Sequence, residues 1–140
     1  MFNATIKIGK TLIEKFPKEM LKMVISAPAE IIVKLQKDLK NRYGDKFRFD
    51  TSWPEGLEIQ SIDSGKGVAV KYLKNHLGVD IHTTVGVGDY ENDITLLEYS
   101  DIGYAVSNAI DSVKKIADRI TVSNSEHALA AIIKELERGM

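Results

Sequence analysis

The sequence predicts an α/β protein, in which a parallel sheet with helices on its faces is preceded by a small α+β unit. Three observations support this prediction. Short apolar stretches alternate with amphipathic helical patterns over residues 63–140, as is typical of parallel strands joined by crossover helices. Residues 46–61 instead show two alternating stretches around a turn, which indicates a strand pair. Hydrophobic residues make up 44% of the 140-residue chain and charged residues 28%, the ordinary balance of a globular domain.

The front unit, residues 1–62, combines strands with one long helix. An apolar run that stops at Pro28 suits a buried strand. Apolar residues then recur at helical spacing from Glu30 onward, and Gly44 stands where a left-handed C-cap would end the helix. The predicted elements are a strand over 22–27, a helix over 30–43, and strands over 46–52 and 56–61 around a turn at 53–56.

The second unit, residues 63–140, repeats strand and helix. The helix that follows Gly65 carries Ala69, Leu73 and Leu77 on one stripe and is expected to stop at Gly78. Right-handed crossovers between the remaining elements would make the strands parallel and cover both faces of the sheet. Those elements are predicted as strands over 83–87, 102–106 and 120–122, and helices over 92–99, 109–117 and 125–136.

Composition excludes several classes of function. The formal net charge of -1 gives no electrostatic reason to bind nucleic acid or an anionic membrane. The absence of cysteine excludes disulfides, thiolate metal sites and a cysteine nucleophile. No stretch approaches the roughly 18 apolar residues of a membrane helix, and the N-terminus lacks the apolar segment of an export signal. We therefore expect a cytoplasmic protein without nucleic-acid or membrane partners.

The stretch TVGVGDYENDITLLE, residues 84–98, is the most informative part of the chain. It places four polar side chains directly after a small apolar strand: Asp89, Glu91, Asn92 and Asp93. In an open parallel sheet, ligands bind beyond the carboxyl ends of the strands. Gly86 and Gly88 are expected to let the backbone turn tightly and to allow close approach by a ligand. A hard cation such as Mg²⁺ would need carboxylate oxygens in that crevice.

A simpler interpretation of the same turn is helix capping. Carboxylates at a helix start are stabilised by capping and by the helix dipole, by a few tenths to about 1 kcal/mol each. Four polar groups exceed what capping requires. The local sequence alone leaves a metal or phosphate site and a capped, solvated helix start as two open interpretations.

GDYEND follows a predicted strand, and SGKGVAVKYL lies some 20 residues earlier at a predicted helix start. Together these two motifs resemble the haloacid dehalogenase (HAD) superfamily, and more closely its Cof-type phosphatases. The downstream segments IGYAVSNAIDSVKKIAD and RITVSNSEHALAAIIKEL agree, so the resemblance spans residues 13–136. It implies a HAD-like Rossmannoid core with an α+β cap, and Mg²⁺-dependent hydrolysis of sugar phosphates or similar small phosphorylated metabolites.

The resemblance also implies roles for individual residues. Asp89 would bind Mg²⁺, with Asn92 and Asp93 supporting its waters. Asp93 would also orient Lys66, which would neutralise the phosphate and the nucleophilic carboxylate. Asn108 matches a position at the rim of the substrate site, although a helix N-cap explains that residue equally well.

The family's nucleophile motif, Asp-x-Asp at the end of the first core strand, is absent from these 140 residues. The chain therefore resembles a C-terminal half: a partial cap over 1–62 and the C-terminal half of the core over 63–140. We expect a truncated form with a weak or incomplete Mg²⁺ site that is inactive alone, and whether the chain is an enzyme stays open. The alternative is a non-catalytic module that binds a phosphorylated ligand or assembles with a partner.

Loss of the first core strand would also expose the strand predicted over 83–87. An uncovered strand edge is a template for pairing with another chain. We expect either a homo-oligomer formed through that edge or a requirement for a separate N-terminal half.

Overall fold

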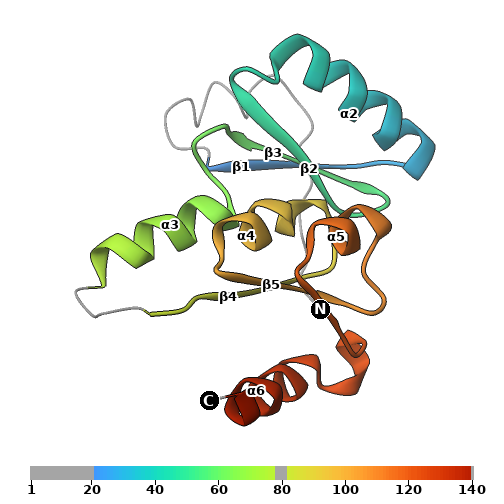
Figure 1. Cartoon of the computed structure of the whole chain (residues 1–140). Helices are drawn as coiled ribbons and strands as arrows, with labels where there is room; N and C mark the ends of the chain where they lie inside the picture. The colour runs from blue at the N-terminus through green and yellow to red at the C-terminus, as the bar shows by residue number, and fades with distance from the viewer. Residues whose placement is uncertain (1–20, 78–81, 140) are drawn as a thin grey trace, which may run out of the picture.

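The computed structural model describes residues 21–77 and 82–139 and contains two three-stranded sheets (Figure 1). The first is antiparallel, with strand order β1-β3-β2, and the second is parallel, with order β4-β5-β6. The predicted α/β architecture is therefore confirmed. Residues 62–65 connect β3 of the first sheet to helix α3, and the predicted boundary between two domains stays a prediction. The first 20 residues of the front unit and Gly78 lie outside the described residues.

The first sheet is covered on one face by a long helix. Ile32 from the helix packs against Phe49 and Leu57 from the sheet, and all three are buried. Full burial of such side chains stabilises the fold by about 1.5–3 kcal/mol each. The elements of this unit are β1 (Lys22–Ser26), α2 (Ala29–Tyr43), β2 (Phe47–Trp53) and β3 (Gly56–Ser61).

The end of α2 differs from the prediction. Gly44 has φ -66°, so its backbone is right-handed, and its N–H donates to the Lys40 carbonyl at 3.0 Å. A Cβ atom added at Gly44 would lie 2.5 Å from that carbonyl oxygen. The left-handed C-cap was therefore wrong: the close approach of the preceding turn, rather than a positive φ, favours glycine here.

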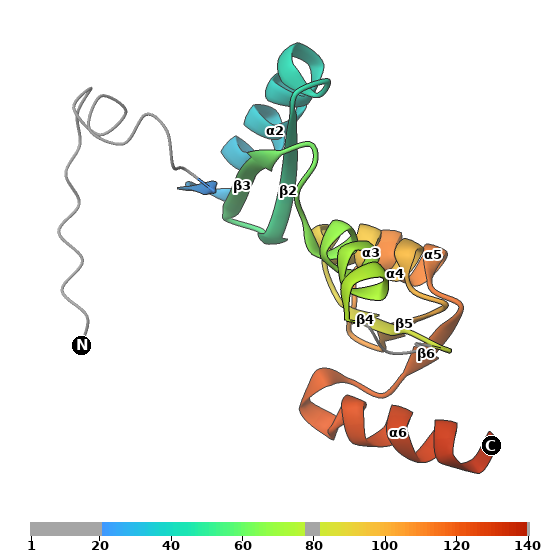
Figure 2. The same ribbon diagram turned by 90° about the vertical axis from the view of Figure 1, so that its left-hand side faces the viewer.

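The second sheet carries helices on both faces (Figure 2). Helices α3, α4 and α5 lie on one side of the sheet and α6 lies on the other. The elements are α3 (Lys66–His76), β4 (Val85–Gly88), η1 (Glu91–Asp93), α4 (Ile94–Tyr99), β5 (Ile102–Val106), α5 (Asp111–Ile116), β6 (Arg119–Thr121), η2 (Asn124–Glu126) and α6 (Ala128–Gly139). Within the described ranges, no helix combines the length and the apolar character needed to span a bilayer.

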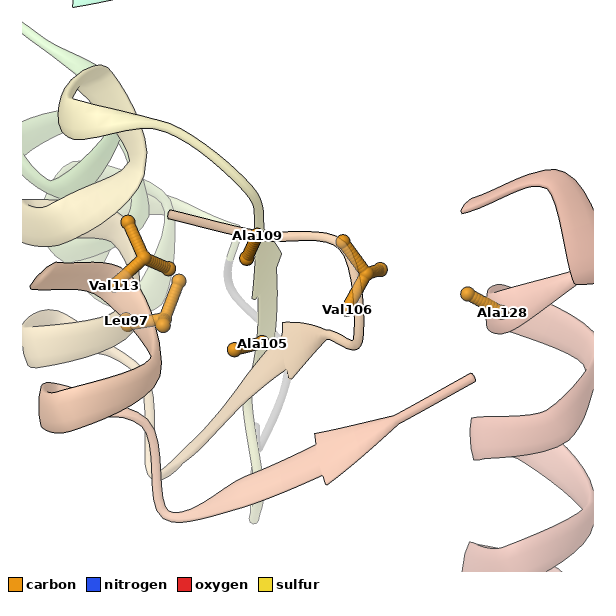
Figure 3. Close-up of a cluster of buried hydrophobic side chains, with 6 residues drawn as sticks. All are labelled: Leu97, Ala105, Val106, Ala109, Val113 and Ala128. Carbon is orange, nitrogen blue, oxygen red and sulfur yellow. The ribbon is translucent and has the colours of Figure 1, made fainter. Parts of the chain in front are cut away.

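Strand β5 lies at the centre of this sheet and supplies its core (Figure 3). Neighbouring residues of a strand point to opposite faces. Ala105 accordingly faces the helices that carry Leu97 and Val113, whereas Val106 faces Ala128 of α6. The core therefore continues through the sheet and joins helices on both sides.

Helix α3 buries a different face from the predicted one. Leu73 and Leu77 of the predicted stripe are 47% and 53% exposed. The helix instead contacts α4 at Gly67, where an added Cβ would lie only 2.2 Å from the Thr95 carbonyl oxygen. The close approach at one glycine sets the buried face, and the apolar stripe points away from this contact.

Asp101 joins the beginnings of β4 and β5. Its carboxylate accepts hydrogen bonds from Lys74 Nζ at 2.9 Å and from the backbone N–H and hydroxyl of Thr84 at 2.7 Å each. The Lys74 ammonium, with further help from Thr84, holds the pKa of Asp101 well below its ordinary value of 3.8. A carboxyl with a lowered folded pKa stabilises the fold above its unfolded pKa, and this contribution is lost as the pH falls through the folded pKa.

We therefore predict that Asp101→Asn lowers the melting temperature at pH 7, and that the gap to wild type narrows as the pH is lowered below about 4. Thermal unfolding followed by circular dichroism between pH 7 and pH 2 measures this difference. Asp45→Asn, at an exposed loop position, is the matched control and should show no such pH-dependent gap. A constant gap at every pH, or no gap at pH 7, would contradict the assignment.

Candidate functional site

A polar cavity lies at the carboxyl end of β4. Its volume is about 170 Å³, below the roughly 300–1,000 Å³ of typical small-molecule pockets, and it opens to solvent. It is formed by the ends of β4 and β5, the start of α3 and the segment after β6, where crevices of parallel sheets bind ligands. The lining residues are Lys66, Val87, Gly88, Asp89, Asp93, Val106 and Asn124. The structure thus brings Lys66, Asp89 and Asp93 together from separate parts of the sequence.

Asp93 holds the backbone and the lysine of this site in place through its buried carboxylate. The residue is only 4% exposed, and its Oδ2 accepts hydrogen bonds from the backbone N–H groups of Asp89 at 3.0 Å and of Tyr90 at 3.4 Å. Its Oδ1 accepts a hydrogen bond from Lys66 Nζ, and the two side chains form an ion pair. One buried carboxylate therefore both closes the turn after β4 and holds the lysine.

Lys66 reaches the cavity because of the backbone just before it. Gly65 has φ 121°, a conformation that favours glycine, and the Arg48 guanidinium occupies the space where a side chain at Gly65 would lie. Lys66 is then the first residue of α3. A cation at a helix N-terminus is disfavoured by the helix dipole, so helix stability does not explain a lysine at this position. The ion pair with Asp93 explains why a lysine stands there.

Asp89 is half-buried beside this ion pair. Burial raises the pKa of Asp89, the neighbouring Asp93 carboxylate raises the pKa further, and Lys66 opposes these effects only in part. The negative charge of Asp89 is therefore incompletely balanced by the described residues. A bound cation would relieve this imbalance.

The donor set fits Mg²⁺ in part. Mg²⁺ is usually held by one or two carboxylates, with waters and substrate phosphate completing its shell. Asp89 can supply such an oxygen, whereas both oxygens of Asp93 already accept hydrogen bonds. Within residues 21–77 and 82–139, no three acidic, histidine or cysteine side chains gather as a metal site. The chain offers one carboxylate ligand, and the other protein ligands would have to come from elsewhere.

Glu91 and Asn92 point away from this cavity. Glu91 Oε2 accepts hydrogen bonds from Gln36 Nε2 at 2.6 Å and from the Thr51 hydroxyl at 2.9 Å, and Asn92 Nδ2 donates to Ser52 Oγ at 2.7 Å. All three partners belong to the front unit. The sequence grouped the four polar residues of the turn as one cluster, but the structure divides them between a cavity and an interface. The role predicted for Asn92 beside the metal waters stays a prediction.

The glycines before Asp89 serve packing rather than turning. Among the described glycines only Gly65 has a positive φ. A Cβ at Gly88 would lie 2.4 Å from Asp93 Cβ, and one at Gly86 would lie 2.5 Å from Ser100 Oγ. The expected tight turn at Gly86 and Gly88 was therefore wrong, because these residues are small to let α4 and the acidic turn pack against β4.

Two asparagines connect the neighbouring loops. Asn108 Oδ1 accepts the backbone N–H of Asn124 at 3.1 Å, which ties the loop after β5 to the loop after β6. Asn124 lines the cavity and Asn108 does not. The sequence analysis missed Asn124. Its position three residues beyond β6, at the same edge of the sheet as Asp89, was the available signal.

The fold and the site together define an α/β protein with a polar cavity at the carboxyl ends of parallel strands. The model of the haloacid dehalogenase-like hydrolases matches residues 3–133. The chain belongs to this family.

Individual relatives agree with this result. YxeH of Bacillus subtilis, a candidate phosphatase, is 34% identical over 130 residues, which cover 89% of this chain and 47% of YxeH. The 5-amino-6-(5-phospho-D-ribitylamino)uracil phosphatase YitU of Bacillus subtilis is 29% identical over 138 residues, covering 96% of this chain and 50% of YitU. A solved haloacid dehalogenase-like hydrolase from B. subtilis superposes with a TM-score of 0.75 at 29% identity, covering 88% of this chain and 44% of that chain. The chain spans about half the length of the curated relatives it matches.

Proposed function

We propose that this chain carries the magnesium and lysine side of a phosphatase site that acts on small phosphorylated metabolites such as sugar phosphates. The observation that carries the proposal is the ion pair of Lys66 with buried Asp93, directly beside the half-buried Asp89. Family membership supports hydrolysis, and the substrate named for YitU, a phosphorylated ribityl compound, supports a small phosphorylated metabolite.

Each residue of the cavity has a separate proposed role in phosphate hydrolysis. Asp93 fixes the Lys66 ammonium at the cavity, where it can balance the charge on phosphate oxygens. Asp89 would hold Mg²⁺ at the same strand end, and the bound ion would stabilise negative charge that develops on the phosphate. The attacking carboxylate is not among these groups, because both acidic residues of the cavity are already assigned. The 140 residues contain no Asp-x-Asp, so we propose that the nucleophile is supplied from outside them.

The prediction that tests this division is that the 140-residue chain alone does not hydrolyse 4-nitrophenyl phosphate, with or without Mg²⁺. Release of 4-nitrophenol by purified chain is compared with release by the Asp89→Ala variant. Both are expected to match the buffer blank. Mg²⁺-dependent turnover that disappears in Asp89→Ala would contradict the proposal, since it would require a nucleophile within the chain.

We also propose which part of the surface receives the complementary half. In the described sheet, β4 pairs only with β5 and is an edge strand. A cavity of about 470 Å³ is lined mainly by apolar residues, with Val87 and Val106 on the sheet side and Ala128 and Leu129 at the start of α6. Leu129 and Ile133 on α6 are 65% and 56% exposed. We propose that the complementary half supplies a strand beside β4 and a helix over this cavity, which together would cover the free strand edge and the exposed leucine and isoleucine of α6. A second copy of the chain is the alternative partner for the same edge.

A further inference from the structure

Glu91 lies two residues after Asp89, yet its carboxylate binds the front unit. One oxygen, Oε2, accepts hydrogen bonds from Gln36 of α2 at 2.6 Å, and from the Thr51 hydroxyl of β2 at 2.9 Å and its backbone N–H at 3.3 Å. Hydrogen bonds to an ionised acceptor are roughly twice as strong as neutral ones. The turn that carries Asp89 is therefore attached to two elements of the front unit through one side chain.

Further polar contacts join the two units on either side of Glu91. Asn92 donates to Ser52 at 2.7 Å, and Arg48 Nη1 donates to the Thr95 hydroxyl at 3.2 Å and to the Ser64 carbonyl at 3.1 Å. A cavity of about 350 Å³ with Arg48 and Glu91 in its lining lies between the units, so packing there is incomplete. These hydrogen bonds therefore contribute to the relative position of the two units.

The turn itself can transmit a displacement. The backbone N–H groups of Asp89 and Tyr90 are both held by the Asp93 carboxylate, and the Asp93 N–H donates to the Tyr90 carbonyl at 2.9 Å. Residues 89–93 are therefore internally braced. A shift of Glu91 that follows the front unit would move Asp89 and Asp93 with it rather than bend the turn between them.

We propose that Glu91 is a positioning residue that couples the placement of the front unit to the orientation of Asp89. The proposal rests on the proposed function only in taking Asp89 as the metal ligand. Glu91 does not line the cavity at the carboxyl end of β4, where Asp89 and Lys66 lie, and would touch neither metal nor phosphate. Its effect would pass through the braced turn, so the state of the front unit would set how well Asp89 faces the cavity.

The test measures amide hydrogen exchange by NMR in the full 140-residue chain. In Glu91→Ala, exchange at the Asp89 and Tyr90 amides should accelerate by about tenfold or more, because the braced turn, without its attachment to the front unit, would open as a whole more often and break the bonds of both amides to Asp93 together. Glu91→Gln retains a carbonyl oxygen that can accept from Thr51, and should restore most of the protection. Glu98→Ala, at an exposed position on α4, is the matched control and should leave both amides unchanged.

Thr51→Val is a second, independent test of the coupling, because the substituted residue lies in the front unit. It removes the hydroxyl that donates to Glu91 and should also accelerate exchange at Asp89 and Tyr90, across the interface. If Glu91→Ala does not fold, this milder variant still tests whether the front unit is coupled to the turn that carries Asp89. Unchanged exchange at both amides in folded Thr51→Val and Glu91→Ala would overturn the proposal. Paramagnetic broadening by Mn²⁺ is recorded separately: its absence near Asp89 in wild type would count against the metal site and would leave the exchange result standing.

Discussion

Replacement of Asp93 by alanine is expected to lower the free energy of unfolding by about 3 kcal/mol, because it leaves buried donors without an acceptor. Asp93 is 4% exposed, and its carboxylate accepts hydrogen bonds from the backbone N–H groups of Asp89 and Tyr90 and from Lys66 Nζ. Removing it would release the turn after β4 and the lysine together. Urea unfolding followed by circular dichroism measures the change, and Lys66 Nζ should become more mobile in the same variant.

Two further variants sharpen this prediction. Asp93→Asn keeps one carbonyl acceptor and the shape of the side chain but loses the charge that pairs with Lys66, so it should fall between wild type and alanine. Asp63→Ala, at an exposed position between the two sheets, should change the free energy of unfolding by no more than about 0.5 kcal/mol. An equally small change for Asp93→Ala would show that Asp93 does not hold the site together.

The architecture could be predicted where the local pattern and the tertiary environment agree. The strand over 102–106 was predicted with the bounds it has in the structure, because four of its five residues are buried in the middle of the sheet. Which face of helix α3 is buried could not be predicted in this way. Its burial depends on how closely Gly67 approaches the backbone of Thr95, a distance that the spacing of apolar residues does not encode.

The site shows the same division. The order of strands and helices was enough to place Asp89 and Asp93 at a strand end, and the family resemblance brought in Lys66 from an earlier helix. The direction of Glu91 could not be read from the sequence, because it depends on donors in the front unit some 40 and 55 residues away. Asn124 was missed for a related reason: it reaches the cavity only through the third strand of the sheet.

The most direct test of the central claim is reconstitution of the site. The segment of YitU that precedes its matching region is fused to the N-terminus of this chain, and Mg²⁺-dependent hydrolysis of 4-nitrophenyl phosphate is measured. The two halves assayed alone and the fusion with Asp89→Asn serve as controls. We predict that the fusion hydrolyses the substrate, that neither half does, and that Asp89→Asn reduces turnover by about 100-fold or more. A cooperatively folded fusion without Mg²⁺-dependent turnover, or one whose turnover is unaffected by Asp89→Asn, would contradict the claim.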